Sequence, residues 1–426
     1  MLMNKAAGKY SKDIQDKIYF YLLMSFGFCL ILPRNFTVII LILLLLNWLV
    51  KLDFKNSFLK LINCSYFIVF ILPFAILIIW LFGTDNFEYA FFKIEKSLAL
   101  FIFPLVIFSS RPLQQNEYRK IFKAFILSIS IGSIIAVLFA LYKRYIVSGL
   151  TLIELNNFFI DIPLLYMSHI YFGYYVVTAV ILTIYIYMTE PNLKTGTRTA
   201  IAILLLYLCV FIMLCAGLAS FISILAVGLF LTIAYYSQIN KRFLIAFALM
   251  ATTIGCLVVL KGSNNTLERY KQRFNVSFKT IENNPYNYSS TRIGPLLAGL
   301  TIIKDNWFLG VGTGDTQDEM AVVYVEKGLD RLLGFNSHNQ YLDFLMTFGI
   351  IGLFVLCLFY FYPLIKSLKL RQYHYTCFLF MIIICSITEN ILENNKCIFL
   401  LAFFNTLLAS QMVTNNAAKH FIKRTI

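Results

Sequence analysis

Charged residues are scarce in this sequence. Only 13% of its 426 residues are charged, whereas 60% are hydrophobic; ordinary soluble domains carry about 25% charged residues. This shortage excludes a set of soluble domains, a disordered chain and a disulfide scaffold. The remaining class is an all-α polytopic membrane protein, in which each span takes about 20 apolar residues. With loops between the spans, the chain holds about 12 transmembrane helices.

Acidic residues are the scarcer charged type. The chain has 21 Asp and Glu against 36 Lys and Arg, a formal net charge of +15. In a soluble protein this excess would suggest nucleic acid as a partner. In a membrane protein, cationic loops instead set the orientation of the helices. We therefore expect contact with membrane lipids and no nucleic-acid partner.

Cysteine is absent from the one long polar segment. All nine cysteines lie inside apolar runs or at their ends, which excludes a disulfide framework and a zinc ribbon. The sequence also lacks a cluster of Cys, His and carboxylate residues with the spacing of metal ligands. We therefore expect neither a bound metal nor a cofactor.

Long apolar runs dominate the rest of the chain. We interpret residues 1–426 as a single transmembrane domain, with one large loop at residues 261–337 between the ninth and tenth spans. The predicted spans are 18–33, 36–50, 62–83, 97–110, 122–142, 168–188, 199–216, 218–237, 244–260, 340–365, 375–390 and 397–413.

The Lys and Arg residues outside the long loop predict the orientation of these spans. Most of them fall in segments on the same side of the membrane as the N-terminus. Long loops cross membranes largely regardless of their charge. We therefore expect both termini in the cytoplasm and the loop 261–337 in the periplasm. The opposite orientation would require translocation of the last basic cluster, Lys419, Lys423 and Arg424.

Span centres nearly free of charge argue against a transport path through the membrane. Transporters often show internal repeats and charged or broken helices at mid-membrane, and we find no such repeat here. Asp343, Glu389 and Glu393 fall close to span ends. The pattern favours chemistry at the membrane surface.

The start of an amphipathic helix in the long loop is a candidate anion site. Apolar residues at 293, 296, 297, 300 and 303 follow helical spacing, and Ser290 or Thr291 can cap the helix. Arg292 would then lie among free helix amides, an arrangement that suits phosphate or pyrophosphate. The alternative is a solvated arginine on an interfacial helix.

A glycine-rich stretch follows at Gly310-Val311-Gly312-Thr313-Gly314-Asp315. It superficially looks like a dinucleotide-binding loop, but no strand precedes it and no βαβ unit surrounds it. We interpret it as a flexible turn that joins the loop helix to the site.

The most informative residue is His338, where the loop re-enters the membrane. On a continuous helix, Gly349 and Gly352 would lie below His338 on nearly the same stripe, so that another helix could approach closely. A histidine at a water–lipid boundary is a candidate general base. The alternative is an interfacial histidine that anchors a helix end.

These residues resemble a known family. His338-Asn339, nine residues, then Gly349-x-x-Gly352 is similar to a motif of the O-antigen ligases, and Arg292-x-x-x-Leu296 is similar to another. Both lie in the place that the family implies, the large periplasmic loop before the tenth span. Leu296, Gly349 and Gly352 would be structural parts of these motifs. The related O-antigen polymerases resemble the chain almost as closely.

The resemblance implies a metal-independent, inverting glycosyltransferase in the bacterial inner membrane. Its donor would be a glycan on undecaprenyl pyrophosphate, and its acceptor a hydroxyl of lipid A–core or of another glycan. His338 would deprotonate the acceptor hydroxyl on the periplasmic side, and Arg292 would bind the pyrophosphate. Asn339 would orient His338 or bind sugar.

The chain departs from the family at one point. Many relatives carry a Ser-Arg pair near the start of a middle span, whereas the stretch Cys215–Ser220 has no arginine. Lys143 and Arg144, on the same side of the membrane, are candidates for the second pyrophosphate contact. The resemblance also suggests that His169 lines an acceptor groove, with an interfacial anchor as its alternative. We interpret Lys93, Glu95 and Lys96 as ordinary helix-end charges.

Ligation of a lipid-linked glycan onto lipid A–core is thus the leading interpretation. A polymerase that joins lipid-linked repeat units is the closest alternative. A protein O-oligosaccharyltransferase is the second alternative. A polysaccharide transporter is the third, although the sequence shows no polar path through the bilayer.

Overall fold

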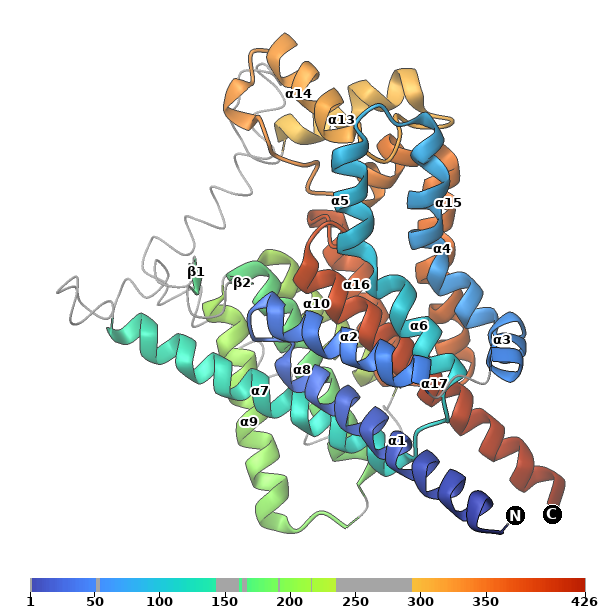
Figure 1. Ribbon diagram of the computed structural model, residues 1–426. Helices are drawn as coiled ribbons and strands as arrows, with labels where there is room; N and C mark the ends of the chain where they lie inside the picture. Colours follow the sequence, from blue (N-terminus) through green and yellow to red (C-terminus); the bar gives the residue numbers. More distant parts are fainter. Residues whose placement is uncertain are drawn as a thin grey trace.

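The computed structural model describes residues 2–50, 54–142, 161–162, 167–190, 192–215, 217–234 and 293–425. Helices make up most of this part of the chain (Figure 1). The strands within it are β1 (Asp161–Ile162) and β2 (Met167–Ser168), which form a short antiparallel pair. An all-α polytopic membrane architecture is therefore confirmed.

The helices of the first half are α1 (Leu2–Cys29), α2 (Arg34–Val50), α3 (Phe54–Ile62), α4 (Ser65–Ile79), η1 (Trp80–Gly83), α5 (Phe87–Ser97), α6 (Ala99–Ser109) and α7 (Gln115–Tyr142). Those that follow are α8 (His169–Thr189), α9 (Thr195–Leu214), α10 (Leu218–Ala234), α13 (Ile293–Asn306), α14 (Thr316–Glu326), η5 (Asp330–Leu332), α15 (Gln340–Lys369), α16 (Tyr373–Thr388) and α17 (Asn395–Thr425).

The long apolar helices coincide with the predicted spans. In the described residues, six helical segments are long and apolar enough to cross a membrane, or seven if α2 and α3 form one bent span. Two further helices, in α10 and α16, are apolar but shorter. The predicted ninth span, 244–260, lies outside the described residues, so the total of twelve stays a prediction. The fourth predicted span, 97–110, corresponds to the short helix α6, which continues α5.

The core of the bundle lies around α8 and α17, whose apolar stretches are the most buried of the six segments. Around them α1 packs on α7, α10 on α16, and α15 on both α4 and α16. The outer helices keep apolar side chains exposed, among them Leu138 and Ile203. A lipid environment tolerates such exposure because acyl chains are as apolar as these side chains.

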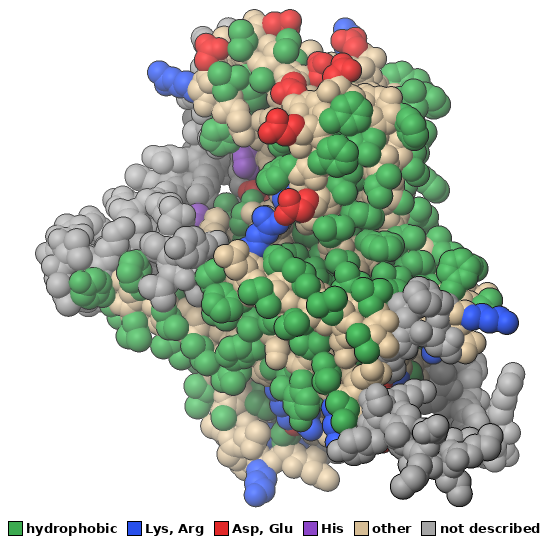
Figure 2. Space-filling model, in the orientation of Figure 1, with side chains coloured by type: hydrophobic (Ala, Val, Ile, Leu, Met, Phe, Trp, Pro, Cys, Tyr) green, Lys and Arg blue, Asp and Glu red, His purple; other side chains and the backbone are tan. Residues whose placement is uncertain are grey.

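The helices α13, α14 and η5 form a small lobe at one end of the molecule, and both termini lie toward the opposite end (Figure 1). The lobe has its own apolar cluster, which includes Ile302, Met320 and Tyr324. Many Asp and Glu side chains gather over it, whereas apolar side chains cover much of the bundle (Figure 2). This contrast separates a polar lobe from an apolar, membrane-embedded bundle.

The predicted loop helix is present as α13, but a different face of it is buried. The sequence pattern placed the apolar face on 293, 296, 297, 300 and 303. In the structure Ala298, Gly299 and Ile302 are buried, whereas Leu296 and Leu300 are 39% and 50% exposed. The buried face approaches α15 closely at Gly299, where a side chain would lie 2.6 Å from the Leu342 side chain and would force it to shift.

Candidate functional site

His338 lies between the lobe and the first turn of α15, in an unusual backbone conformation. Its φ of 48° falls in the left-handed region, which non-glycine residues seldom adopt, although histidine does so more readily than most. Nδ1 of its imidazole lies 3.2 Å from Oε2 of Glu389. The imidazole is 25% exposed and the Glu389 side chain 4%. A buried carboxylate thus holds one ring nitrogen, while part of the ring stays accessible.

Asn339 is the N-cap of α15. Its side-chain oxygen accepts hydrogen bonds from the backbone N–H groups of Tyr341 and Leu342, each at 3.0 Å. Such caps satisfy helix amides that otherwise lack partners. Asn339 therefore fixes the point at which the helix begins, directly after His338, and its side-chain oxygen is occupied by this cap.

A polar segment that joins α16 to α17 forms the other wall of the site. Residues 389–394, Glu-Asn-Ile-Leu-Glu-Asn, follow one apolar helix and precede the next. Besides the contact of Glu389 with His338, the amide oxygen of Asn390 accepts from Ser337 Oγ at 3.2 Å, and Glu393 Oε2 accepts from Asn336 Nδ2 at 3.3 Å. The sequence interpretation missed this role; the available signal was a dense polar run between two apolar runs.

Lys93 of α5 forms a buried ion pair with Glu393. Its Nζ lies 2.9 Å from Oε1 of Glu393, and the two side chains are 7% and 13% exposed. Burial alone would lower the pKa of Lys93, but the carboxylates of Glu393 and Asp343 outweigh it and raise that pKa. Burial opposes ionisation of Glu393, whereas Lys93 draws its pKa below the usual value. The prediction that Lys93 is an ordinary helix-end charge was therefore wrong.

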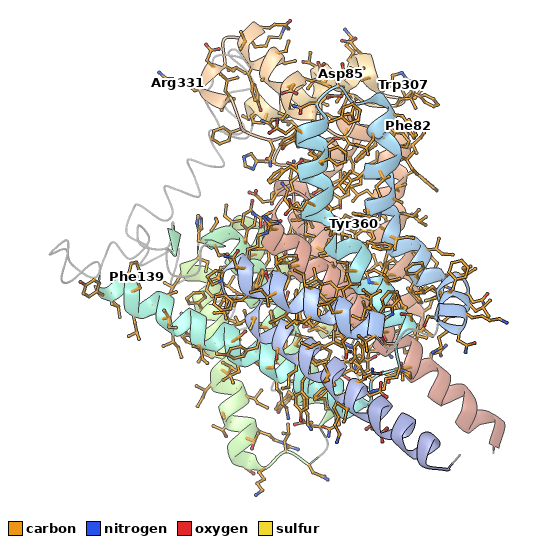
Figure 3. All side chains as sticks on the ribbon, viewed as in Figure 1. Phe82, Asp85, Phe139, Trp307, Arg331 and Tyr360 are labelled. Carbon is orange, nitrogen blue, oxygen red and sulfur yellow. The ribbon has the colours of Figure 1, made fainter. Side chains whose placement is uncertain are left out.

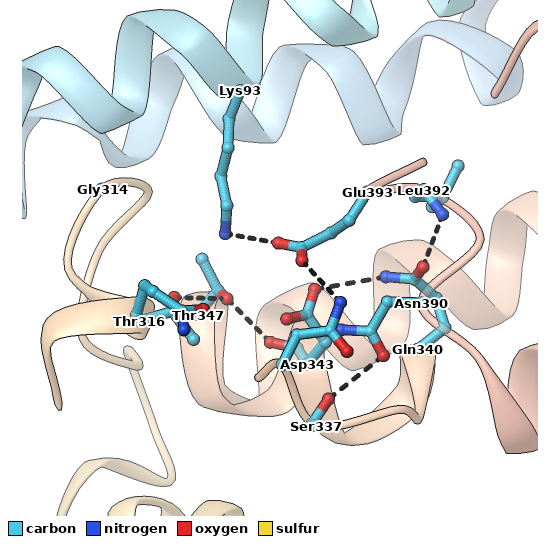
Figure 4. Close-up of polar contacts among 12 residues, drawn as sticks. Lys93, Gly314, Thr316, Ser337, Gln340, Asp343, Thr347, Asn390, Leu392 and Glu393 are labelled. Atoms are coloured by element: carbon cyan, nitrogen blue, oxygen red, sulfur yellow. Dashed lines mark hydrogen bonds and ion pairs between the residues drawn. The ribbon is translucent and has the colours of Figure 1, made fainter. Parts of the chain in front are cut away.

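The first turns of α15 carry a buried polar cluster beside this ion pair (Figure 4). The side chain of Gln340 donates to Asp343 Oδ2 at 3.3 Å and accepts from Leu392 N at 2.6 Å. Thr347 Oγ1 donates to the Asp343 carbonyl and lies 2.8 Å from Thr316 Oγ1 of the lobe. A cavity of about 20 Å³ adjoins Asp343 and Gln340, which is enough space for one water molecule.

Gly349 interrupts α15, contrary to the continuous helix that the sequence suggested. Its φ of 62° and ψ of −157° are not helical. At the break, Trp307 O accepts from Ile350 N at 2.9 Å, and Met346 O accepts from Val311 N at 2.9 Å. A side chain at position 349 would lie 2.1 Å from the Phe308 carbonyl oxygen. Gly349 therefore admits a loop segment, where we had expected another helix.

Gly352 also differs from that expectation. A side chain there would meet Phe348 Cβ at 2.3 Å and the Phe344 carbonyl oxygen at 2.7 Å, both in α15 itself. His338 precedes the helix, so it does not share a helical stripe with either glycine. The two glycines shape the bend of α15 below the site.

The Gly310–Asp315 turn is packed tightly, which corrects the prediction of a flexible turn. Side chains at Gly310 and Gly314 would meet backbone atoms of Thr347 and Asn86 at 2.4 and 2.0 Å. The Asp315 carboxylate accepts from the backbone N–H groups of Asp85 and Asn86. Phe82, Asp85 and Trp307 are together at this end of the molecule (Figure 3). The turn thus holds the segment between α4 and α5 against the lobe.

His169 is the first residue of α8, and Ser168 caps that helix. The side chain of Tyr175, further along α8, donates to the carbonyl of Lys396 at 2.8 Å. The start of α8 therefore lies near the segment that holds His338. The other proposed substrate contacts, Arg292, Lys143 and Arg144, lie outside the described residues.

No group of three or more His, Cys, Asp or Glu side chains in the described part of the chain could hold a metal ion. The polar groups of the site instead bind one another: Lys93 with Glu393, and His338 with Glu389.

Comparison with known proteins agrees with the sequence motifs. Residues 193–357 match the family described as O-antigen ligase. This match includes α13, α14, His338 and both glycines of α15. No curated protein matches the chain. The apolar helices are those of a multi-pass membrane protein, and the match over residues 193–357 supports the O-antigen ligase and polymerase superfamily.

Proposed function

We propose that the protein transfers a glycan from undecaprenyl pyrophosphate to a hydroxyl of lipid A–core. The observation that carries this proposal is the His338–Glu389 pair between the lobe and the bundle. Glycosyl transfer to a hydroxyl requires a group that removes its proton, and an accessible imidazole held by a carboxylate is suited to that task. The family match supports a lipid-linked glycan as the donor.

The two ring nitrogens of His338 have different roles in the proposed reaction. In this reaction Nδ1–H of His338 donates to the Glu389 carboxylate, 3.2 Å away, which leaves the lone pair of Nε2 to accept the proton of the acceptor hydroxyl. The acceptor oxygen forms a bond to the anomeric carbon, and the bond from that carbon to the pyrophosphate oxygen breaks. Undecaprenyl pyrophosphate leaves with the electron pair, and attack from the opposite face inverts the carbon. Glu389 stabilises the resulting imidazolium.

The remaining roles rest on the resemblance. Arg292 would bind the pyrophosphate and stabilise the charge that develops on it. Lys143 or Arg144 would supply a second contact, and Asn339 or His169 would contact sugar. We propose that no metal takes part. Purified protein should then keep its transferase activity in excess EDTA; a loss that Mg²⁺ or Mn²⁺ restores would overturn this part.

We further propose that the protein lies in the bacterial inner membrane, with both termini in the cytoplasm and the site in the periplasm. The charge bias of the loops supports this orientation, as does the position of the lobe opposite the termini (Figure 1). Reporter fusions after Gly328 should indicate the periplasm, and fusions after Lys369 the cytoplasm. A cytoplasmic signal after Gly328 would reverse the orientation.

The decisive experiment for the acceptor is the lipopolysaccharide pattern of a deletion strain. Loss of all O-antigen from lipid A–core, with accumulation of the lipid-linked polymer, is the expected result for a ligase. Lipid A–core that bears a single repeat unit would identify the polymerase instead. Reintroduction of the wild-type chain, and of His338→Ala in parallel, links either pattern to the site.

A further inference from the structure

Three consecutive residues before α15 are each held by the segment between α16 and α17. Asn336 contacts Glu393, Ser337 contacts Asn390, and His338 contacts Glu389. His338 is also the residue with the left-handed backbone. Such a conformation persists only where surrounding contacts enforce it. The contacts of Asn336 and Glu393 identify what enforces it here.

The amide of Asn336 joins Glu393 to the backbone of His338. Its Nδ2 donates to Glu393 Oε2 at 3.3 Å, and its Oδ1 accepts from His338 N at 3.2 Å. A carboxylate can only accept hydrogen bonds, so Glu393 determines which end of the amide faces it. The oxygen must then face His338. An amide turned the other way would present its N–H₂ group to the His338 N–H, which cannot accept.

Lys93 allows this carboxylate to remain charged in a buried place. The Lys93–Glu393 ion pair lies on the side of Glu393 opposite to Asn336, because the two oxygens of the carboxylate have different partners. Lys93 is more than 240 residues away from His338 in the sequence and comes from a different helix. The site is therefore connected to α5 through a continuous series of side-chain contacts.

We propose that Glu393 and Asn336 are positioning residues that hold His338 in its catalytic orientation, with Lys93 as the buried counter-charge. This inference rests on the proposed function of His338 as the base. It assigns to Glu393 a task beyond structural stability, namely the direction of the Asn336 amide. The alternative is an ion pair that only stabilises the fold.

Exchanging the two charges separates these alternatives. In the double variant Lys93→Glu with Glu393→Lys, the buried ion pair remains, but position 393 can only donate hydrogen bonds. The Asn336 amide must then turn, and the backbone of His338 loses its acceptor. A purely structural pair predicts normal activity for this variant. The positioning role predicts a folded protein with impaired turnover.

The neutral double variant Lys93→Met with Glu393→Gln weakens the constraint without reversing it. The new glutamine can accept from Asn336, but its own N–H₂ group can also donate, so the reversed Asn336 amide is no longer excluded. The positioning role predicts a kcat between those of wild type and the charge exchange. Glu95→Gln is the matched control, because Glu95 lies on the same helix in an exposed ion pair with Arg34. This control should leave kcat unchanged.

The test is an in vitro transfer assay with a purified lipid-linked glycan donor, together with thermal unfolding in detergent. The charge exchange should lower kcat by about tenfold to 10²-fold, the range for small misplacements of a reacting group, with the donor KM near wild type. A normal kcat would overturn the inference. If the exchanged protein does not fold, Asn336→Ala decides by the same kcat criterion.

His338→Ala in the same assay distinguishes a failure of the proposed function from a failure of the positioning role. If His338→Ala keeps its turnover, the proposed function fails. If His338→Ala loses turnover while the charge exchange keeps it, only the positioning role is wrong.

Discussion

The two parts of α15 on either side of Gly349 have opposite surroundings. In the first part the polar side chains of Gln340, Asp343 and Thr347 are buried and hydrogen-bonded. In the second part apolar side chains are exposed, among them Ile350 at 43% and Phe354 at 68%. One apolar-looking sequence run thus contains a wall of the polar site and a membrane-facing span.

The break at Gly349 is what allows this division. A continuous helix would use its own carbonyls and amides for internal hydrogen bonds. Here Met346 O and Thr347 O accept from the Gly310–Asp315 turn, and Ile350 N donates to Trp307 O just before that turn. The first part of α15 is thereby joined to the lobe and to His338, whereas the second part belongs to the bundle. Changes in the first part should affect chemistry, and changes on the exposed face of the second part should affect little.

The largest expected effect is on chemistry at the start of α15. His338→Ala should reduce kcat by about 10²–10⁴-fold, the usual contribution of a general base, because no other described group takes the place of its imidazole. Donor binding should be nearly unchanged. The measurement is a transfer assay with lipid-linked donor, alongside a donor-binding titration. Near-normal turnover would leave His338 as an interfacial anchor.

Loss of the buried ion pair beside the first part should have a large effect on stability. Lys93→Met removes the hydrogen-bonded counter-charge of the buried Glu393, which typically costs about 3–5 kcal/mol of unfolding free energy. Arg34→Met breaks the exposed ion pair with Glu95, which lies on the same helix as Lys93. This change should cost less than about 1 kcal/mol. Denaturant unfolding in detergent measures both. Equal losses of unfolding free energy would show that burial does not make the Lys93–Glu393 pair more important for stability than the exposed pair.

The loss of unfolding free energy in Lys93→Met should depend on pH with a definite sign. In the wild type the pKa of Glu393 is lowered, so its contribution is present above the unfolded value of about 4.3 and is lost as pH falls through the folded value. The pKa of Lys93 is raised, so its contribution is lost only as pH rises through that value. In Lys93→Met, the lone Glu393 takes up a proton more readily. The deficit should therefore be larger at pH 8 than at pH 5.

Sequence patterns predicted the elements that depend on local apolar runs. The spans at α4, α7, α8, α9 and α17 follow from such runs, and the helix α13 follows from its spacing. The pattern also placed His338 at the re-entry of the loop. These features depend on residues that are neighbours in the chain, so local hydrophobicity and periodicity are sufficient.

The missed features depend on residues far apart in the chain. Lys93 looked like a helix-end charge because Glu393 is 300 positions away. The break in α15 was not predicted because Gly349 lies within an unbroken apolar run. The break accommodates the backbone of Trp307–Leu309, which lies against Gly349. The buried face of α13 packs against α15 and α14 and differs from its most apolar stripe. Tertiary contact overrides local pattern at each of these places.

The junction itself should give an intermediate effect. Gly349→Ala puts a side chain on a left-handed residue and within 2.1 Å of a backbone oxygen, which should cost about 2–4 kcal/mol of stability from strain and overpacking together. Gly83→Ala is the control, because a side chain there would meet nothing within 4 Å. Thermal unfolding of both variants checks this. A stable Gly349→Ala protein would mean that the break in α15 is not enforced by the Phe308 backbone.

The smallest effect should come from the exposed face of the second part. Phe354 is 68% exposed, and lipid acyl chains are as apolar as its ring, so Phe354→Ala should change stability by less than about 0.5 kcal/mol. Phe359, in the same part of α15, is 1% exposed, and Phe359→Ala should cost about 3–5 kcal/mol through the cavity that it leaves. Unfolding of both variants in mixed micelles measures the contrast, and transfer activity should be normal for Phe354→Ala. A loss above about 1 kcal/mol for Phe354→Ala would mean that this face packs against protein and not lipid, because only a protein neighbour would lose packing that lipid cannot replace.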